Sequence, residues 1–267
     1  MTAQGRQPLL TIEHVCASYR GGPHIVDDVC LEVAPGEVLA LVGESGSGKT
    51  TVARTVVGLL PIDEGEIAFD GHVLKGTARP PEVRRAMQMV FQDPRSALNP
   101  RMSVFRIIGE GWSAHPDARP TGSQRDAVAA LLDQVGMDPS VIDRRPSQLS
   151  GGQCQRVAIA RALALSPRML VCDEAVSALD VSVQAQILRL LHDLREEHGL
   201  ALLFITHDLG VVRQISDRVA VMEHGRIVEQ GRTEDIYTRP QDPYTIELLN
   251  AALDVAEDEA AQPAPVQ

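Results

Sequence analysis

A glycine-rich segment between a buried strand and a helix constrains this chain more than any other feature. Residues 43–50 read Gly-Glu-Ser-Gly-Ser-Gly-Lys-Thr, which fits the pattern GxxxxGK[ST] of a phosphate-binding loop. The apolar run 38–42 predicts a strand covered on both faces, and the apolar spacing in 50–60 predicts a helix. Glycines let backbone N–H groups curl around phosphate oxygens, and the helix N-terminus directs its dipole at them. This segment, called the P-loop below, predicts a nucleotide site in which Lys49 reaches the β- and γ-phosphates and the Thr50 hydroxyl binds Mg²⁺.

Composition and charge narrow the function classes. The 267 residues are 44% hydrophobic and 23% charged, which is enough apolar content for a buried core without disulfides. Aromatic residues make up only 3% and the formal net charge is −11, so no nucleic-acid partner is expected. The four cysteines lack CxxC spacing, which argues against a zinc site and a disulfide framework. No secretory leader or membrane-length apolar run is visible, so we expect a soluble protein of a reducing compartment.

The chain alternates strand-like and helical patterns, with a helical stretch inserted between two halves. Prolines punctuate short helical pieces over about 93–149, whereas the segments on either side alternate buried strands with amphipathic helices. We therefore predict one domain over 1–250, with an α/β core at about 1–92 and 166–235 and a helical subdomain between them. Residues 251–267 are acidic and rich in Pro and Ala, which predicts a disordered tail.

Local patterns predict individual elements within this organisation. Asp-Gly and His-Gly pairs supply turn residues for hairpins over 65–74 and 218–231. Continuous apolar runs predict buried strands over 168–172 and 199–207, and helical spacing predicts an amphipathic helix over 182–197.

Two adjacent carboxylates, Asp173 and Glu174, end one of the buried strands. In a P-loop core we expect this strand to lie beside the strand that leads into the P-loop, which brings Asp173 within reach of the Mg²⁺ shell. Glu174 is then free to orient or deprotonate an attacking water. Alone, the pair could also be a solvated strand end, although this is the weaker alternative, and its coupling to a P-loop favours the metal-site interpretation further.

A second potential anion site precedes a helix over 154–165. Ser150 is a candidate N-cap, and Gly151 and Gly152 leave the helix N-terminus open to an anion. One chain therefore carries two phosphate-binding helix starts about a hundred residues apart in sequence. One ATP does not need both within a single subunit.

Taken together, the motifs of this sequence resemble those of a known family. The P-loop, Leu-Ser-Gly-Gly-Gln (149–153), Asp173-Glu174, Ser-Ala-Leu-Asp (177–180) and the isolated His207, in that order, are similar to an ABC-transporter ATPase subunit over roughly residues 9–250. The resemblance implies an α/β P-loop ABC ATPase core with an antiparallel β subdomain and a helical insertion. It also implies a head-to-tail dimer, in which each ATP lies between the P-loop of one subunit and the LSGGQ segment of the other.

The resemblance carries further roles over, residue by residue. Gln92 matches the glutamine that senses the γ-phosphate and contacts the membrane subunit, and His207 matches the histidine that contacts the γ-phosphate. Tyr19 matches the aromatic residue that stacks on adenine, and Asp180 matches a residue that communicates across the dimer. The catalytic residues implied are Glu174, His207 and Gln92, and the metal ligands are Thr50, Gln92 and Asp173. The nucleotide-binding residues implied are Tyr19, Gly43, Glu44, Ser45, Gly46, Ser47, Gly48, Lys49, Thr50, Thr51, Ser150, Gly151, Gly152, Gln153 and Asp180.

Two stretches point to a subgroup. Residues 91–104 and 239–251 resemble the ATPases of bacterial peptide and nickel importers. Members of that subgroup often carry a C-terminal cysteine cluster for an iron–sulfur centre, but no cysteine follows Cys172, so no cluster is expected. Ala175 and Val176 stand where many relatives have Pro-Thr, a departure that leaves the preceding carboxylate in place.

The resemblance implies an Mg²⁺-dependent ATPase that powers an ABC importer, with di- or oligopeptides as the leading cargo. The implied partners are two transmembrane permease subunits, a second ABC ATPase of the same or a related chain and, indirectly, an extracytoplasmic solute-binding protein. The implied location is peripheral, on the cytoplasmic face of the cell membrane. Two alternatives stay open: an importer of nickel or another small solute, and a soluble ABC ATPase without a transport role, such as an iron–sulfur assembly factor.

Overall fold

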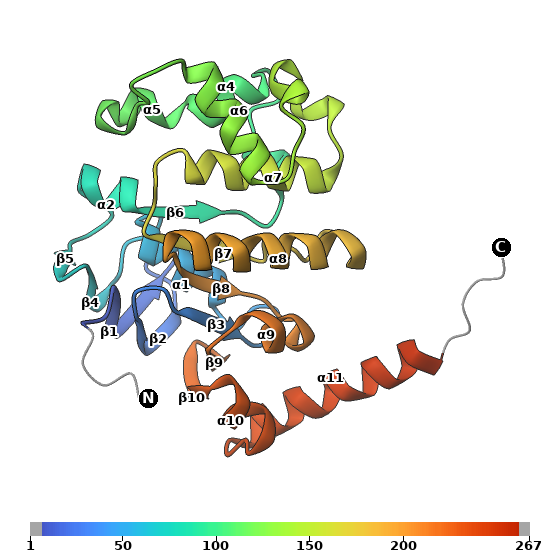
Figure 1. Ribbon diagram of the computed structural model, residues 1–267. Helices are drawn as coiled ribbons and strands as arrows, with labels where there is room; N and C mark the ends of the chain where they lie inside the picture. The colour runs from blue at the N-terminus through green and yellow to red at the C-terminus, as the bar shows by residue number, and fades with distance from the viewer. Residues whose placement is uncertain (1–6, 262–267) are drawn as a thin grey trace.

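The computed structural model describes residues 7–261. The α/β part of the chain contains two β-sheets (Figure 1). The larger sheet has six strands in the order β10-β9-β3-β8-β7-β6, and every neighbouring pair is parallel except β9 and β10. Its central strands are fully buried, as expected for strands covered by helices on both faces. The strands are β3 (Val38–Val42), β6 (Met87–Val90), β7 (Met169–Asp173), β8 (Ala201–Ile205), β9 (Arg218–Glu223) and β10 (Arg226–Arg232).

The position of β7 corrects one expectation. The strand that ends in Asp173 was predicted to lie beside β3, but β8 lies between them. The two ends still meet because helix α1 (Lys49–Val57) leaves β3 and crosses the sheet face, where it contacts both β8 and β7. Helix α1, which follows the P-loop, therefore spans the distance between β3 and β7.

The smaller sheet is antiparallel, with the order β2-β1-β4-β5. The predicted hairpin is present, and Asp70 and Gly71 form its turn with positive φ values of 50° and 76°. An apolar cluster fills the space between this sheet and the larger one. The strands are β1 (Leu10–Ser18), β2 (His24–Val33), β4 (Glu64–Phe69) and β5 (His72–Leu74).

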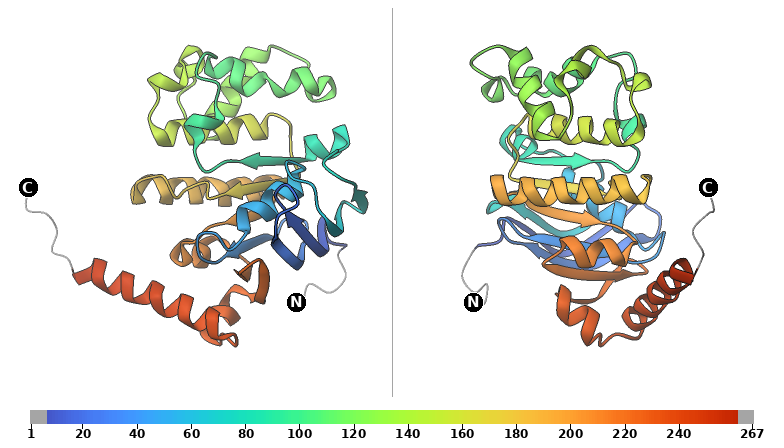
Figure 2. Two further views of the ribbon diagram at one scale, coloured as in Figure 1. Left: turned by 180° about the vertical axis from the view of Figure 1, so that it is seen from behind. Right: turned by 45° about the vertical axis from the view of Figure 1, so that its right-hand side comes forward.

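A helical layer connects β6 to β7 and lies along the β6 edge of the larger sheet (Figures 1 and 2). Its apolar residues form one continuous cluster with residues from one face of the larger sheet. Within it, the buried indole of Trp112 donates a hydrogen bond of 2.8 Å to the Ala164 carbonyl oxygen. The helical segments are α3 (Pro94–Ala97), α4 (Val104–Gly109), α5 (Gly111–Ala114), η1 (Pro116–Ala118), α6 (Gln124–Gln134), η2 (Pro139–Asp143), η3 (Pro146–Gln148) and α7 (Gly151–Leu163).

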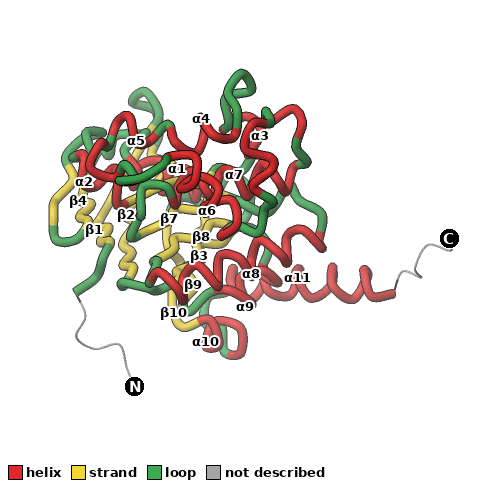
Figure 3. The backbone as a smooth tube through the Cα atoms, turned by 45° about the horizontal axis from the view of Figure 1, so that its top comes forward, coloured by secondary structure: helices red, strands yellow, loops and turns green. Residues whose placement is uncertain are grey.

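The remaining helices pack around the α/β part. Helix α8 (Val181–His198) buries the apolar stripe that its spacing predicts, and Ile187, Leu191 and Leu194 are all nearly inaccessible. The other helices are α2 (Pro81–Ala86), α9 (Leu209–Ile215) and α10 (Thr233–Thr238). In Figure 3 the helices, in red, surround the strands, in yellow.

The C-terminal segment corrects a second expectation. Helix α11 (Pro243–Ala261) continues through most of the stretch that was predicted to be disordered, and it projects away from the sheets (Figures 1 and 3). Ala and Glu make up seven of the eleven residues 251–261, and these are strong helix formers, so local propensity outweighs the acidic composition. Residues 262–267 of the predicted tail lie outside the described residues. Among the helices that are described, none combines the length and apolarity needed to cross a membrane.

Candidate functional site

The P-loop joins the end of β3 to the first turn of α1 in the arrangement that the sequence predicts. Its glycines adopt positive φ values, and close packing requires two of them. A Cβ at Gly43 would lie 2.1 Å from the Met222 carbonyl oxygen, and one at Gly48 would lie 2.7 Å from the Ile25 carbonyl oxygen. Gly46 faces open space, so its role is conformational, with φ at +87°. Tight packing at both ends thus fixes a loop whose centre, around Gly46, is exposed.

The start of α1 is open to an anion. Its N-cap is Gly48, which has no side chain to accept hydrogen bonds from the first helical N–H groups. Those N–H groups carry the positive end of the helix dipole, which suits phosphate oxygens. The donor set of the P-loop therefore fits a nucleotide phosphate.

Lys49 is buried, and its ammonium group lies within the P-loop. Its Nζ donates hydrogen bonds of 2.8 Å to the Gly43 carbonyl oxygen and 2.6 Å to the Glu44 carbonyl oxygen. Burial lowers the pKa of Lys49, while the nearby carboxylates of Glu174 and Asp173 act in the opposite direction. These carbonyl groups hold the ammonium group in place within the P-loop.

Thr50 and Asp173 form the direct link between the P-loop helix and the end of β7. Thr50 Oγ1 donates a hydrogen bond of 2.9 Å to Asp173 Oδ1. Burial raises the pKa of the Asp173 carboxyl group, and the hydrogen bond from Thr50 opposes that shift. A hydroxyl and a carboxylate side by side are the oxygen ligands that Mg²⁺ prefers, so these two residues fit an Mg²⁺ ion.

Glu174 is the meeting point of three elements. Gln92, after β6, donates a hydrogen bond of 2.6 Å from its Nε2 to Glu174 Oε2, and Nδ1 of His207, after β8, lies 3.4 Å from Glu174 Oε1. Ser177 Oγ also donates a hydrogen bond of 3.0 Å to the Glu174 carbonyl oxygen. The Glu174 side chain is mostly buried, whereas that of His207 is 57% exposed. The structure therefore brings all three predicted catalytic side chains together around one carboxylate.

The backbone of Glu174 is strained. Its φ is 47°, in a region that non-glycine residues rarely adopt. The Glu174 N–H donates a hydrogen bond of 2.9 Å to the Ile205 carbonyl oxygen, which holds this conformation at the end of the sheet. Strain of this kind concentrates at functional sites, where the surrounding structure maintains it.

Tyr19 lies in the turn after β1, and its side chain reaches α1. Its hydroxyl accepts a hydrogen bond of 2.9 Å from Arg54 Nη1, and the residue is 38% exposed. The contact with α1 ties this aromatic ring to the helix that begins at the P-loop. Nothing in the local sequence pattern indicates Arg54 as its partner.

The LSGGQ segment begins α7 and makes its hydrogen bonds locally. Ser150 is the N-cap, as predicted: its Oγ accepts from the Gln153 N–H at 3.2 Å, and Gln153 Oε1 accepts from the Ser150 N–H at 3.0 Å. A Cβ at Gly152 would lie 2.5 Å from Val183 Cγ1, so this glycine permits α7 to approach α8. Among the described residues, no hydrogen bond joins this segment to the P-loop of the same chain.

Asp180 occupies the N-cap position of α8 and is exposed. Its side chain makes no capping hydrogen bond. Within the part of the chain that the structure describes, neither Asp180 nor the LSGGQ segment joins the cluster around Glu174. The predicted site residues therefore fall into two sets, one at the P-loop and one at the starts of α7 and α8.

Comparison with known proteins identifies the family. Residues 26–177, more than half of the chain, match the ABC transporter family. The chain belongs to the ABC transporter family. The oligopeptide transport ATP-binding protein OppF of Salmonella typhimurium is 48% identical over 85% of this chain and 68% of its own length. OppF of Bacillus subtilis is 44% identical over 92% and 82%, and the glutathione import ATP-binding protein GsiA of Pectobacterium atrosepticum is 49% identical over 85% and 37%.

Solved ABC structures share the fold. CbiO1 of Clostridium perfringens, part of an ABC transporter complex, has a TM-score of 0.76 with 27% identity over 96% of this chain and all of its own. The ATP-binding cassette MJ0796, a dimer bound to ADP and Pi, has a TM-score of 0.71 with 27% identity over 84% and 98%. The predictions of family, ABC ATPase fold and ATP-dependent transport function are thus confirmed.

One hydrogen bond to the P-loop could not be predicted from the sequence. The Tyr244 hydroxyl oxygen, at the start of α11, accepts a hydrogen bond of 2.9 Å from the backbone N–H of Glu44. The two residues are 200 positions apart, and no motif pairs them. Only the resemblance of residues 239–251 to a subgroup pointed to this segment at all.

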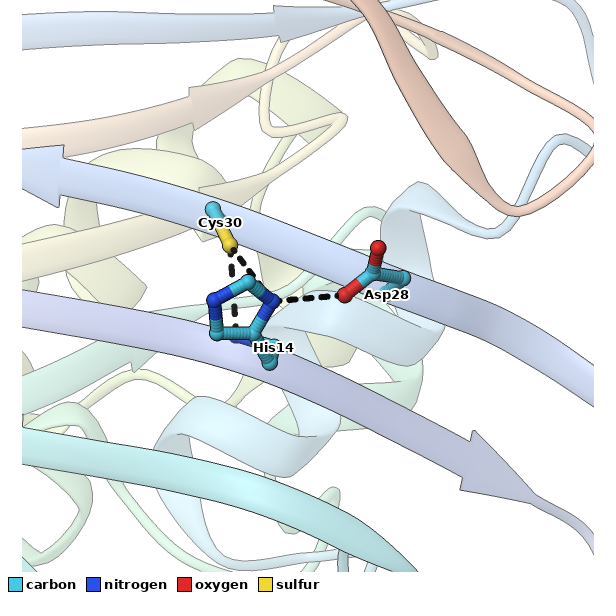
Figure 4. A group of neighbouring side chains, drawn as sticks. All are labelled: His14, Asp28 and Cys30. Carbon is cyan, nitrogen blue, oxygen red and sulfur yellow. Dashed lines mark hydrogen bonds and ion pairs between the residues drawn. The ribbon is translucent and has the colours of Figure 1, made fainter.

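A second grouping lies on the smaller sheet, where strand pairing brings His14, Asp28 and Cys30 together (Figure 4). His14 Nδ1 lies 2.8 Å from Asp28 Oδ1 and 3.7 Å from Cys30 Sγ. A nitrogen, a carboxylate oxygen and a thiol at this spacing could hold a divalent metal ion, which cysteine spacing alone did not indicate. Hydrogen bonds among the three side chains account for their arrangement.

Proposed function

We propose that this chain is the ATP-hydrolysing subunit that powers an importer of di- or oligopeptides. The observation that carries the proposal is the convergence of Gln92 and His207 on the Glu174 carboxylate, next to the P-loop residues Lys49 and Thr50. The names of the relatives, oligopeptide transport and glutathione import ATP-binding proteins, support the transport role and the peptide class.

Each side chain of the site has a separate role in ATP hydrolysis. Lys49 and the first N–H groups of α1 bind phosphate oxygens, and Tyr19 offers a ring face to the base. Glu174 holds or takes the proton of the attacking water, while Gln92 and His207 orient the carboxylate. Thr50, Asp173 and Gln92 would hold Mg²⁺, which when bound neutralises charge on the phosphates.

The two sets of site residues support a head-to-tail dimer. The LSGGQ segment and Asp180 lie apart from the Glu174 cluster, so a second ABC ATPase subunit would complete each site with its own LSGGQ segment. The dimeric state of the related cassette MJ0796 supports this arrangement. Two permease subunits, with an extracytoplasmic solute-binding protein acting through them, would place the chain at the cytoplasmic face of the membrane.

Peptide uptake by cells tests the transport role. In a strain that lacks this chain, we expect uptake of a labelled di- or tripeptide to fall to background, while nickel uptake stays normal. The wild-type chain should restore uptake and Glu174→Gln should not. Unchanged peptide uptake with loss of nickel uptake would replace the peptide proposal by the nickel alternative.

A further inference from the structure

One peptide group of the P-loop is held at both of its ends. The unit that links Gly43 to Glu44 has its carbonyl oxygen bonded to Lys49 Nζ at 2.8 Å and its N–H bonded to the Tyr244 hydroxyl oxygen at 2.9 Å. Lys49 thus contacts one end of the plane, and α11 contacts the other. Because Gly43 has a φ of +147° and no side chain, its own backbone preference does little to fix the orientation of this plane.

Tyr244 itself has a well-defined position. Asp242 Oδ1 accepts a hydrogen bond of 2.8 Å from the Tyr244 N–H, and Glu229 on β10 accepts hydrogen bonds from the N–H groups of Gln241 and Asp242. Its ring packs against the apolar cluster that contains Val42, the residue directly before the P-loop. The start of α11 is therefore fixed to β10 and to the end of β3 before it contacts Glu44.

From this geometry we propose that Tyr244 is a positioning residue for Lys49, acting through the Gly43–Glu44 peptide. The hydroxyl keeps the peptide plane in the orientation that presents the Gly43 carbonyl oxygen to the ammonium group. Loss of the hydroxyl frees the plane to rotate, and ATP must then order the loop when it binds, which weakens binding. The inference rests on the proposed function, because it assigns the purpose of the contact to ATP binding.

The position also links α11 to the nucleotide site. Leu248 and Leu249 pack on the same cluster as Tyr244, so the apolar side of the helix and the hydroxyl contact are held together. Any displacement of the first turns of α11 moves the acceptor away from the Glu44 N–H. ATP affinity therefore depends on how this C-terminal helix is seated.

The test compares two tyrosines of the same cluster in the full chain. Tyr244→Phe removes only the hydroxyl that accepts from Glu44. Tyr237→Phe is the matched control, because its hydroxyl donates to the Leu209 carbonyl oxygen and makes no contact with the P-loop. Calorimetric titration gives the ATP dissociation constant, hydrogen exchange reports on the Glu44 amide, and thermal unfolding reports general damage.

We expect Tyr244→Phe to weaken ATP binding about fivefold, the effect of one net hydrogen bond, and to accelerate exchange at Glu44. Tyr237→Phe should change neither, whatever it does to the melting temperature. Unchanged affinity and exchange in Tyr244→Phe would overturn the inference, as would equal effects in the control. Exchange needs no nucleotide, so it tests the contact even if the wild-type chain binds no ATP, a result that would overturn the proposed function.

Discussion

The Thr50 hydroxyl donates a 2.9 Å hydrogen bond to the Asp173 carboxylate and so joins two motifs that lie 123 residues apart. Thr50 belongs to the helix that follows the P-loop, and Asp173 ends β7. In the sheet, β8 separates β7 from β3, the strand that leads into the P-loop. The pair supplies oxygen ligands for the proposed Mg²⁺ site, and Glu174 is the residue that directly follows Asp173.

The first prediction concerns Glu174→Gln. The amide keeps the size of the side chain but cannot accept a proton, so we expect ATP turnover to fall about a hundredfold or more. ATP binding should persist, and an ATP-bound dimer should accumulate in size-exclusion chromatography. Turnover close to that of the wild type would remove Glu174 from its proposed role.

The second prediction concerns the charge on Asp173. Burial raises its pKa above the ordinary value of 3.8, so folding disfavours the ionised form of this carboxyl group. The stability from this carboxyl group is fully present below pH 3.8 and is lost as pH rises through the raised pKa. Without metal at pH 7, Asp173→Asn should therefore raise the melting temperature by a few degrees, while it lowers Mg²⁺-dependent ATP turnover.

The pH dependence provides the control for this prediction. The gain in melting temperature from Asp173→Asn should shrink on acidification and vanish below pH 3.8, where the wild-type carboxyl group is protonated in both states. A gain that stays constant with pH would mean that packing, and not charge, is responsible.

The third prediction concerns Ser150→Arg at the start of α7. If LSGGQ serves the ATP of the partner subunit, this change should abolish turnover but leave ATP binding by the isolated chain within about twofold. Ser123→Arg is a suitable control, since Ser123 also caps a helix, accepting from the Asp126 N–H at 3.3 Å. The control should lose the capping energy of about 1 kcal/mol and keep its turnover. A collapse of ATP affinity in Ser150→Arg would contradict the arrangement across the dimer.

The fourth prediction concerns the buried Arg79, which supports the C-terminal end of α1. Its guanidinium donates to the carbonyl oxygens of Thr55, Val56 and Gly76 at 2.5, 3.1 and 2.9 Å. Arg79→Ala leaves these carbonyl groups without their donor, so we expect a loss of about 3 kcal/mol in the free energy of unfolding. Urea denaturation measures it, and the exposed Arg125→Ala, which breaks a surface ion pair with Asp143, should show no comparable loss.

Local motifs were the part of the site that the sequence could predict. The P-loop, the carboxylates at the end of β7 and the capping role of Ser150 each follow from residues close together in the chain, where the physical rule acts within one turn or one strand. The helical layer and both hairpins followed for the same reason.

Long-range geometry could not be predicted, because topology determines it. The position of β8 between β3 and β7, the bond from Gln92 to Glu174 and the bond from Glu44 to Tyr244 all join distant segments. The positive φ of Glu174 depends on its position directly after the carboxyl end of β7, and composition does not predict it. The extent of α11 follows helix propensity, which outweighs the acidic composition of this segment.

The most direct test of the account is to isolate the tagged chain from native membranes in mild detergent and to identify the proteins that accompany it. We expect two multi-span permease subunits, together with a second ABC ATPase or a second copy of this chain. Recovery from the soluble fraction with cytosolic partners alone would contradict the transport role and leave an ABC ATPase without a transporter.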